Sequence, residues 1–482
     1  MRRGDVQRSG ECMKLSEFEA WSKRIASWSR SYLETLRDRP VRSKSEPGDV
    51  LRALPASPPE SAEAFDRIFA DFENLLPDAM THWQHPRFFA YFPANAAPAS
   101  MLAEQLANTM AAQCMLWQTS PAAAEMETRM VDWLRQGLGL PDGFLGTIHD
   151  TATTATLAAI LTMRERALGF LGNTEGLSGQ KRLRVYASAQ THSSIDKDIR
   201  LSGIGLDNLV KIPAHADSGP FYGMDADALR AAIREDRARG YCPAGLVVCV
   251  GGTSIGAIDP VEEVLSIARE EGLYSHVDAA WAGSAMICEE YRTLWSGIEM
   301  ADSIVFNPHK WLGAQFDCSV QFLKDPTDQI RTLAERPAYL ETLDSRGDLD
   351  ARVDYSEWTL PLGRRFRALK LWFLMRAYGL DGLRERIRNH VSWAQDAAKA
   401  LASDPALEIT TQPVLSLFTF RHCEGEAATR TLLDRINADG RTYLTQTVHE
   451  GEFVIRFQAG PFDCTREDVQ TAIDTIIELA RA

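Results

Sequence analysis

Long helical patterns alternate with short β-branched runs between about residue 100 and residue 380. The helical patterns cover 151–166, 226–237 and 261–271, and the apolar runs cover 183–187, 246–250, 274–277, 303–306 and 319–323. Strands that alternate with helices in this way predict an α/β domain with a largely parallel sheet. In such domains the functional side chains lie at the carboxyl ends of the strands.

The two ends of the chain have different patterns. Large aromatic residues recur at helical spacing over 21–36 and again over 65–76, with a Pro/Ser-rich linker at 54–61 between them. These two helices either pack on their own domain or reach another subunit, and the residues leave both possibilities open. A helix over 383–401, strand-like stretches at 414–420 and 453–457 and a last helix indicate a small α+β domain. We therefore expect three parts, at residues 1–98, 99–380 and 381–482.

Composition excludes several classes of function. The 52 Lys and Arg residues and 66 Asp and Glu residues give a net charge of −14, which argues against a broad nucleic-acid or anionic-lipid surface. The eight cysteines are scattered without a C-x-x-C pair, as in a protein whose thiols are reduced. Because no apolar run approaches the ~18 residues that span a bilayer, we expect a cytoplasmic protein without a membrane partner.

Three chemically active side chains directly follow expected strands. Asp278 ends the run at 274–277, Lys310 follows the next run in an Asn-Pro-His-Lys-Trp turn, and His192 follows the run at 183–187. A lysine amine can hold pyridoxal phosphate as a Schiff base, and a carboxylate can keep the ring nitrogen protonated. A lone Asp is more often a helix cap and a lone Lys is more often solvated. Their occurrence after successive strands favours the cofactor site.

A phosphate site is expected beside this pair. Residues 147–156 place several threonines directly before an Ala/Leu-rich helix, where free N–H groups can bind an anion, although a simple Thr N-cap explains the same pattern. Nucleotide motifs are incomplete, since neither 251–256 nor 202–205 forms G-x-G-x-x-G. His82 and His85 form an H-x-x-H pair without a third metal ligand nearby, so no metal is expected.

Several motifs, in this order, resemble those of the group II pyridoxal-phosphate decarboxylases, and within them the aromatic-L-amino-acid decarboxylases. The likeness begins near Phe65, and its markers are residues 85–93, 120–122 with Glu125 and Glu127, 150–153, 192–194, the Asp278 and Lys310 segments, and 360–367. The resemblance implies the fold-type I, aminotransferase-like architecture and a homodimer whose N-terminal helices clasp the partner. It also implies decarboxylation of tryptophan, dopa, tyrosine or phenylalanine to the arylalkylamine and CO2.

The resemblance also assigns roles to single residues. Lys310 would bind pyridoxal 5'-phosphate covalently, Asp278 would pair with its ring nitrogen, and Ala280 and His192 would lie below and above the ring. The other expected cofactor contacts are Ala152, Thr153, Thr253, Asn307 and His309. The expected substrate contacts are Trp83, Tyr91, Phe92, Pro93, Met115 and Gly363.

Tyr355 has the most specific expected role. It lies in a polar stretch, residues 346–358, that resembles the mobile catalytic loop of the family, whose tyrosine returns a proton to Cα. A tyrosine there favours simple decarboxylation over the alternative, an oxygen-consuming aromatic aldehyde synthase. A catalytically silent regulatory or assembly protein of the same fold is the second alternative. Gly363 leaves room for an indole ring, Met115 alters the pocket wall, and the preferred aromatic amino acid stays open.

Overall fold

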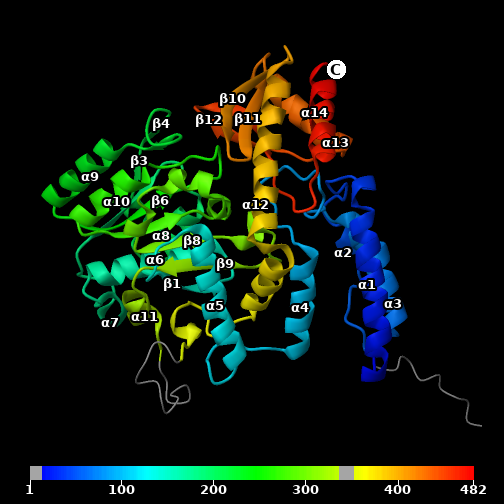
Figure 1. Ribbon diagram of the computed structural model, residues 1–482, viewed down its shortest axis with the longest axis horizontal. Helices are drawn as coiled ribbons and strands as arrows, with labels where there is room; N and C mark the ends of the chain where they lie inside the picture. The colour runs from blue at the N-terminus through cyan, green and yellow to red at the C-terminus, as the bar shows by residue number, and fades with distance from the viewer. Residues whose placement is uncertain (1–12, 336–351) are drawn as a thin grey trace, which may run out of the picture.

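The computed structural model describes residues 13–335 and 352–482. A large sheet with helices around it fills one side of the molecule. A smaller sheet lies beside the C-terminal end of the long helix α12 (Arg367–Ala402) (Figure 1). Expected strands at 303–306 and 319–323 match the observed bounds, and the expected aminotransferase-like α/β architecture is confirmed.

The large sheet has seven strands. In spatial order they are β1 (Leu145–His149), β9 (Ser319–Leu323), β8 (Ser303–Phe306), β7 (Tyr274–Asp278), β6 (Cys242–Cys249), β2 (Leu183–Ser188) and β3 (Leu209–Ile212). The strands from β8 to β3 run parallel to their neighbours, whereas β9 is antiparallel to both β1 and β8. The sheet is therefore largely parallel, as expected, with one reversed strand, β9, next to the edge strand β1.

Helices connect and cover these strands. They are α4 (Pro98–Met110), α5 (Pro121–Leu138), α6 (Ala152–Ala167), α7 (Gly172–Glu175), α8 (Ser194–Leu201), α9 (Ala226–Ala238), α10 (Val261–Glu270) and α11 (Thr327–Leu333). Helix α6 packs across β6, β7 and β8, and α5 packs on β1. A two-stranded hairpin, β4 (Ala214–His215) with β5 (Gly223–Met224), lies outside the sheet. No helix of the described residues is long and apolar enough to cross a membrane.

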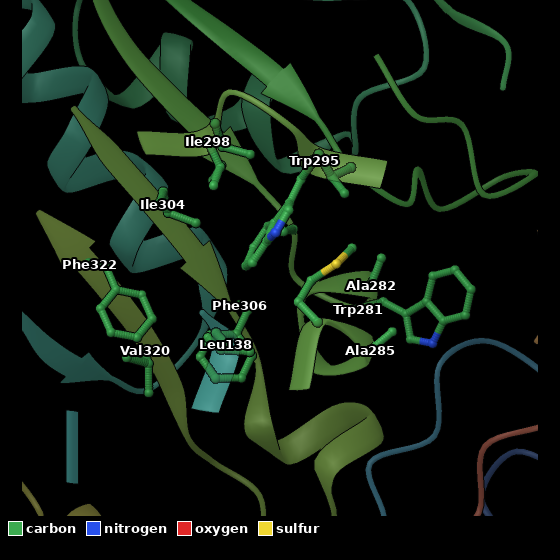
Figure 2. Packing of buried hydrophobic residues seen from close by; sticks show 14 of the residues in the cluster. Leu138, Trp281, Ala282, Ala285, Trp295, Ile298, Ile304, Phe306, Val320 and Phe322 are labelled. Atoms are coloured by element: carbon green, nitrogen blue, oxygen red, sulfur yellow. The ribbon is translucent and has the colours of Figure 1, made fainter. Parts of the chain in front are cut away.

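Aromatic and branched side chains from neighbouring strands fill the main core. The rings of Phe306 in β8 and Phe322 in β9 lie parallel, with centroids 6.1 Å apart, and both are fully buried. Figure 2 shows these rings together with Trp295 and Ile298, which follow β7. Because strands β8 and β9 carry apolar residues on both faces, the sheet is packed on both sides, as parallel sheets require.

The C-terminal sheet is antiparallel, in the order β10 (Leu407–Val414), β11 (Leu417–His422), β13 (Glu452–Gln458) and β12 (Thr445–His449). Helices α13 (Glu426–Asp439) and α14 (Arg466–Ala480) pack against it. The strand expected at 414–420 corresponds to β11, which begins only at Leu417 because the chain turns at Leu415, whose φ is +52°. Strands β1, β3, β4, β5, β10 and β12 were not expected from the sequence.

The N-terminal helices lie beside each other at the edge of the molecule (Figure 1). These are α1 (Phe18–Glu34) and α3 (Phe65–Leu75), joined through the short α2 (Asp49–Ala53). Trp21 packs on Phe65 at 4.6 Å and Trp28 packs on Phe72 at 4.8 Å between ring centroids. The aromatic periodicity therefore builds a helical pair whose large rings pack on one another.

Candidate active site

A cavity of about 240 Å³ opens at the carboxyl ends of the parallel strands. Ten of the residues singled out in the sequence line it: Phe92, Ala152, Thr153, His192, Thr253, Asp278, Ala280, Asn307, His309 and Lys310. The structure adds Thr151, Ser194, Cys249, Gly251, Gly252 and Trp281. The fold thus brings together residues that are up to 218 positions apart, from Phe92 to Lys310.

Two neighbouring strands deliver the central pair. Asp278 is the last residue of β7, and it pairs in register with Val305 of the parallel strand β8. Just beyond β8, Pro308–Leu312 form one π-helical turn that carries Lys310. One Asp278 oxygen accepts a hydrogen bond from the Ala280 N–H at 3.0 Å, and the other has no hydrogen-bond partner among the described residues. The carboxylate is therefore fixed in orientation, with one oxygen available to a ligand.

The Lys310 amine lies in an environment that favours its neutral form. Burial lowers the pKa of Lys310, the Asp278 carboxylate opposes this shift, and the Arg456 guanidinium adds to it. The amine makes no hydrogen bond to a described residue and lies 5.3 Å from the centre of the Phe92 ring. A neutral, unpartnered amine is the form that attacks an aldehyde carbon.

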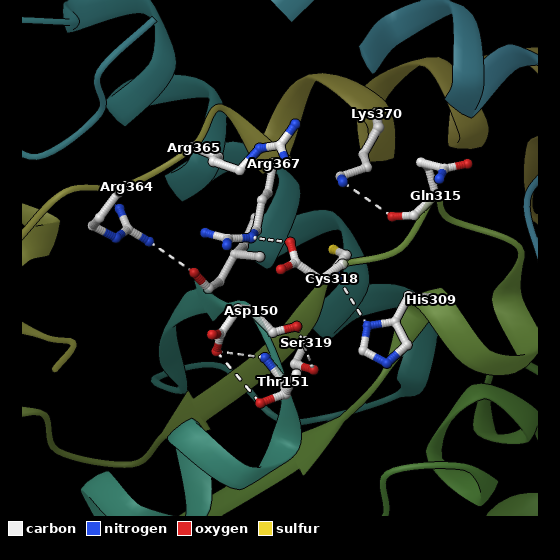
Figure 3. A network of polar contacts seen from close by, with 12 residues as sticks. Asp150, Thr151, His309, Gln315, Cys318, Ser319, Arg364, Arg365, Arg367 and Lys370 are labelled. Carbon is white, nitrogen blue, oxygen red and sulfur yellow. Dashed lines mark hydrogen bonds and ion pairs between the residues drawn. The ribbon is translucent and has the colours of Figure 1, made fainter. Parts of the chain in front are cut away.

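The start of α6 can bind an anion. Asp150 accepts a hydrogen bond from the Thr151 N–H at 2.6 Å (Figure 3) and another from the Thr154 hydroxyl, so its side chain fixes the turn between β1 and α6. The N–H groups of Ala152 and Thr153, in the first turn of α6, have no partner within the helix. Both residues line the cavity, where these N–H groups and the helix dipole favour a phosphate.

His309 and Asn307 add donors to this region. The Cys318 N–H donates to Nδ1 of His309 at 2.9 Å (Figure 3), and burial lowers the pKa of His309 to about 3. The neutral ring must then carry its proton on Nε2. Ser319 Oγ donates to Oδ1 of Asn307 at 2.7 Å, which leaves the amide Nδ2 as a donor. Both side chains are therefore set to donate hydrogen bonds.

His192 has a fixed ring orientation. Its Nδ1 accepts a hydrogen bond from the Ser194 N–H at 3.1 Å, so Nε2 carries the proton of the neutral ring. Partial burial lowers the pKa of His192, and Asp278 opposes the shift. The ring can donate or relay a proton through Nε2.

Two functional residues were missed in the sequence. Trp281 stacks on Phe92 at 4.6 Å and forms an aromatic wall of the cavity. Arg456 of β13 is 3% exposed, donates from Nε to the Ser254 carbonyl at 2.9 Å and lies 5.2 Å from the Phe92 ring centre. Its Nη2 has no hydrogen-bond partner in the described part of the chain, and burial lowers the pKa of Arg456 to about 10. The sequence did contain one indication of Arg456, because a charged residue inside the apolar strand at 453–457 is unusual.

Tyr355 does not lie in this cavity, which corrects its expected placement. The phenol is 3% exposed, hydrogen-bonds to Thr128 Oγ1 of α5 at 2.8 Å and lines a separate cavity of about 480 Å³. Burial, with the nearby Glu127 carboxylate, raises the pKa of Tyr355, which weakens it as an acid. Residues 346–351 of the expected catalytic loop lie outside the described residues.

The other expected substrate contacts do not line the cavity of this chain either. Trp83 and Tyr91 stack on each other with centroids 5.8 Å apart and are 39% and 47% exposed. Pro93 is buried, Met115 is half-buried and Gly363 is exposed. Of the expected substrate contacts, only Phe92 lines this cavity.

The cavity fits pyridoxal phosphate by its unpaired groups. The free Lys310 amine matches the aldehyde, the free Asp278 oxygen matches a protonated ring nitrogen, and the α6 N–H groups match the phosphate. These three features define the site of a pyridoxal-phosphate enzyme.

Comparison with known proteins agrees with this geometry. Residues 47–423 match the family described as the pyridoxal-dependent decarboxylase conserved domain. The aromatic-L-amino-acid decarboxylase of Rattus norvegicus is 38% identical, over 97% of this chain and 98% of the relative. The phenylacetaldehyde synthase of Arabidopsis thaliana is 35% identical, over 94% of each. The crystal structure of Catharanthus roseus tryptophan decarboxylase with L-tryptophan has a TM-score of 0.91 and 34% identity, covering 98% and 99%.

The chain belongs to the pyridoxal-dependent decarboxylase family. It is a decarboxylase, and its cofactor is pyridoxal phosphate.

Replacement of Lys310 by Ala should remove the covalent link to the cofactor. We expect the visible absorbance band of the bound cofactor to disappear and turnover to fall more than about a hundredfold, because the amine supplies nucleophilic catalysis. Spectra and amine release measure the two effects. Lys324→Ala, at an exposed lysine that contacts the Glu299 carbonyl, is the control and should change neither. Wild-type turnover of Lys310→Ala would show that the amine is not the cofactor anchor.

Replacement of Tyr355 by Phe should leave the reaction products unchanged. The variant loses the hydrogen bond to Thr128, so we expect a stability loss of about 1 kcal/mol without added oxygen consumption. Amine, aldehyde and peroxide assays, with an oxygen electrode and denaturant unfolding, measure this. Tyr339, the other tyrosine between Lys310 and Gly363, lies outside the described residues, and Tyr339→Phe is the matched comparison. Aldehyde and peroxide from Tyr355→Phe alone would restore Tyr355 as the proton donor.

Proposed function

We propose that this enzyme decarboxylates an aromatic L-amino acid to the arylalkylamine and CO2. The observation that carries the proposal is the wall of Phe92 and Trp281, stacked 4.6 Å apart, in the same cavity as Lys310. The buried apolar edge of this aromatic pair favours a substrate that buries an aromatic ring against it. The rat relative is named for decarboxylation of aromatic L-amino acids, which supports the same substrate class.

The chain's own residues supply the remaining requirements of the reaction. Pyridoxal phosphate, when bound, withdraws electrons from the carbon that loses CO2. The positive charge of buried Arg456 attracts the α-carboxylate of the amino acid, while the Phe92 ring keeps water from that carboxylate. His192 Nε2 and the Lys310 amine, which both line the cavity, are the groups that can give a proton to the substrate carbon. Asp278 holds the proton on the cofactor's ring nitrogen.

A panel of amino acids tests the substrate class. We expect kcat/KM for tryptophan, dopa, tyrosine or phenylalanine to exceed that for leucine and glutamate by at least about tenfold. The reason is that burial of an aromatic ring against the apolar wall stabilises the bound substrate. Amine and CO2 release measure this with the cofactor-loaded enzyme. Faster turnover of glutamate would contradict the proposal. Ammonia and peroxide with aldehyde would instead identify an aromatic aldehyde synthase, the activity named for the Arabidopsis relative.

The proposal includes a homodimer. Leu102, Leu106 and Met110 form a row along α4 at a spacing of four residues, and they are 58%, 48% and 57% exposed. Phe18 and Ile25 of α1 are also exposed, at 48% and 42%. Rows of exposed apolar side chains mark surfaces that bind protein. A second copy that covers α4 and is clasped by α1 and α3 would bury them.

A charge in the α4 row should disrupt this dimer. We expect Leu106→Glu to shift the protein to the monomer mass, because a carboxylate cannot be buried there without a partner. Light scattering after size-exclusion chromatography measures the mass. Gln105→Glu adds the same charge one position away, off the apolar row, and should remain dimeric. An unchanged mass of Leu106→Glu would place the interface elsewhere.

Location and domain division complete the proposal. The seven cysteines of the described residues are all free, and Cys423 is exposed, which supports the reducing cytoplasm. The net charge of −14 supports the absence of a nucleic-acid partner. Gly379, with φ of +62° inside α12, supports a boundary near residue 380 between the 99–380 and 381–482 parts. Residues 1–98 are the clasp segment.

A further inference from the structure

One buried histidine joins the three elements that carry the main cofactor contacts. His276 of β7 is fully buried, its Nδ1 lies 2.9 Å from Ser303 Oγ of β8, and its Nε2 lies 3.1 Å from Thr156 Oγ1 of α6. Strand β7 ends at Asp278, and β8 leads into the turn with Lys310. A single side chain therefore connects the anion-binding helix to both strands of the central pair.

The contacts of His276 lie close to the cofactor groups along the chain. Thr156 follows Ala152, at the start of α6, by about one helical turn. His276 and Asp278 project from the same face of β7, because side chains alternate along a strand, and they are about 7 Å apart along it. Helix α6 packs across β7 and β8 (Figure 1), so His276 lies between this helix and the two strand ends.

The His276 ring is neutral and uses both of its nitrogens. Burial lowers the pKa of His276 to about 4, and the Asp278 carboxylate opposes the shift. A neutral imidazole has one donor nitrogen and one acceptor nitrogen, so it can form one hydrogen bond of each kind with Thr156 and Ser303. The Thr156 hydroxyl has no other hydrogen-bond partner among the described residues.

Buried amides hold the β8 end of this connection. Gln321 of β9 donates from Nε2 to Ser303 Oγ at 2.9 Å. It also pairs with Gln329 of α11 through two reciprocal hydrogen bonds of 2.8 and 2.9 Å, and Gln329 donates to the Trp358 carbonyl at 2.8 Å. Ser303, Gln321 and Gln329 are all fully buried. The Ser303 hydroxyl is therefore a fixed point from which His276 reaches α6.

Pyridoxal phosphate must be held at both ends at once. The N–H groups of Ala152 and Thr153 match its phosphate, while Asp278 and Lys310 match its ring nitrogen and aldehyde. Both sets of contacts can form together only if their spacing matches the cofactor. A spacing that is fixed before binding reduces the cost of ordering the site, and His276 contacts the elements that carry both sets.

We propose that His276 is a positioning residue for the cofactor, because it holds the phosphate-binding start of α6 at a fixed distance from Asp278 and Lys310. Without its hydrogen bond to Thr156, the start of α6 must be brought into place when the cofactor binds. The cofactor then binds more weakly, and the loss depends on its phosphate. This role does not depend on which amino acid is the substrate.

Removal of the α6 end of the connection tests the proposal. Thr156→Val keeps the shape of the side chain and removes the hydroxyl that contacts His276. We expect the dissociation constant for pyridoxal phosphate to rise about fivefold, which is the effect of one ordinary hydrogen bond. The dissociation constant for pyridoxal, which lacks the phosphate and makes no use of α6, should change little. Titration of the apoenzyme, followed by the visible band, measures both constants.

A second threonine of the same helix provides the control. Thr162 is fully buried, and its hydroxyl donates to the Ala158 carbonyl of α6 at 2.8 Å. Thr162→Val should therefore leave both dissociation constants unchanged. Equal weakening of pyridoxal phosphate and pyridoxal by Thr156→Val would contradict the proposal, and so would unchanged binding of both. The same phosphate-dependent loss in Thr162→Val would also overturn it.

Substitution of His276 itself gives the second measurement. His276→Gln places an amide near the position of ring Nε2, whereas His276→Phe keeps a ring that has no hydrogen-bonding atom. We expect His276→Gln to retain more affinity for pyridoxal phosphate than His276→Phe, with denaturant unfolding of each apoenzyme as the measure of stability. Equal affinities of the two variants would show that the ring nitrogens do not position the cofactor. If His276→Phe does not fold, the comparison of Thr156→Val with Thr162→Val decides.

Discussion

The parallel pairing of β7 with β8 is the constraint on which the active site depends. It places the end of both strands at one edge of the sheet, so that Asp278 and the turn with Lys310 face the same cavity. Helix α6 enters this edge with its N-terminus, since β1 ends there and α6 follows directly. The amine, the carboxylate and the anion-binding N–H groups therefore converge because of the topology.

Burial prepares each of these groups for its role. It lowers the pKa of Lys310, which favours the neutral amine, and it lowers the pKa of His309 to about 3, so that the His309 ring is neutral. Hydrogen bonds to the backbone fix which nitrogen of His309 and of His192 carries the proton. The site is thus organised by backbone contacts before a ligand arrives, which reduces the cost of ordering side chains on binding.

The sequence was sufficient where local pattern and chemistry coincide. Asp278, Lys310 and His192 directly follow strands, and parallel topology brings strand ends together, so their convergence was predictable. The placement of Tyr355 was not predictable, because the hydrogen-bond partner of a loop residue, here Thr128 of α5, depends on tertiary packing. Arg456 was missed for a similar reason, since nothing in the strand at 453–457 indicates that its side chain reaches Phe92 from the other sheet. The reversed direction of β9 also leaves no local signal.

The cavity also depends on contacts that join the C-terminal part to the catalytic turn. Asn95 Oδ1 accepts a hydrogen bond from the Phe462 N–H at 2.7 Å, while its Nδ2 donates to the Lys310 carbonyl at 3.4 Å. Arg456 of β13 reaches the Ser254 carbonyl, one residue after Thr253 of the cavity wall. Movement of the small sheet would therefore be transmitted to the backbone at Lys310 and to the wall opposite it. The C-terminal part therefore supports the active site, because it fixes the position of the Lys310 backbone and of the cavity wall at Thr253.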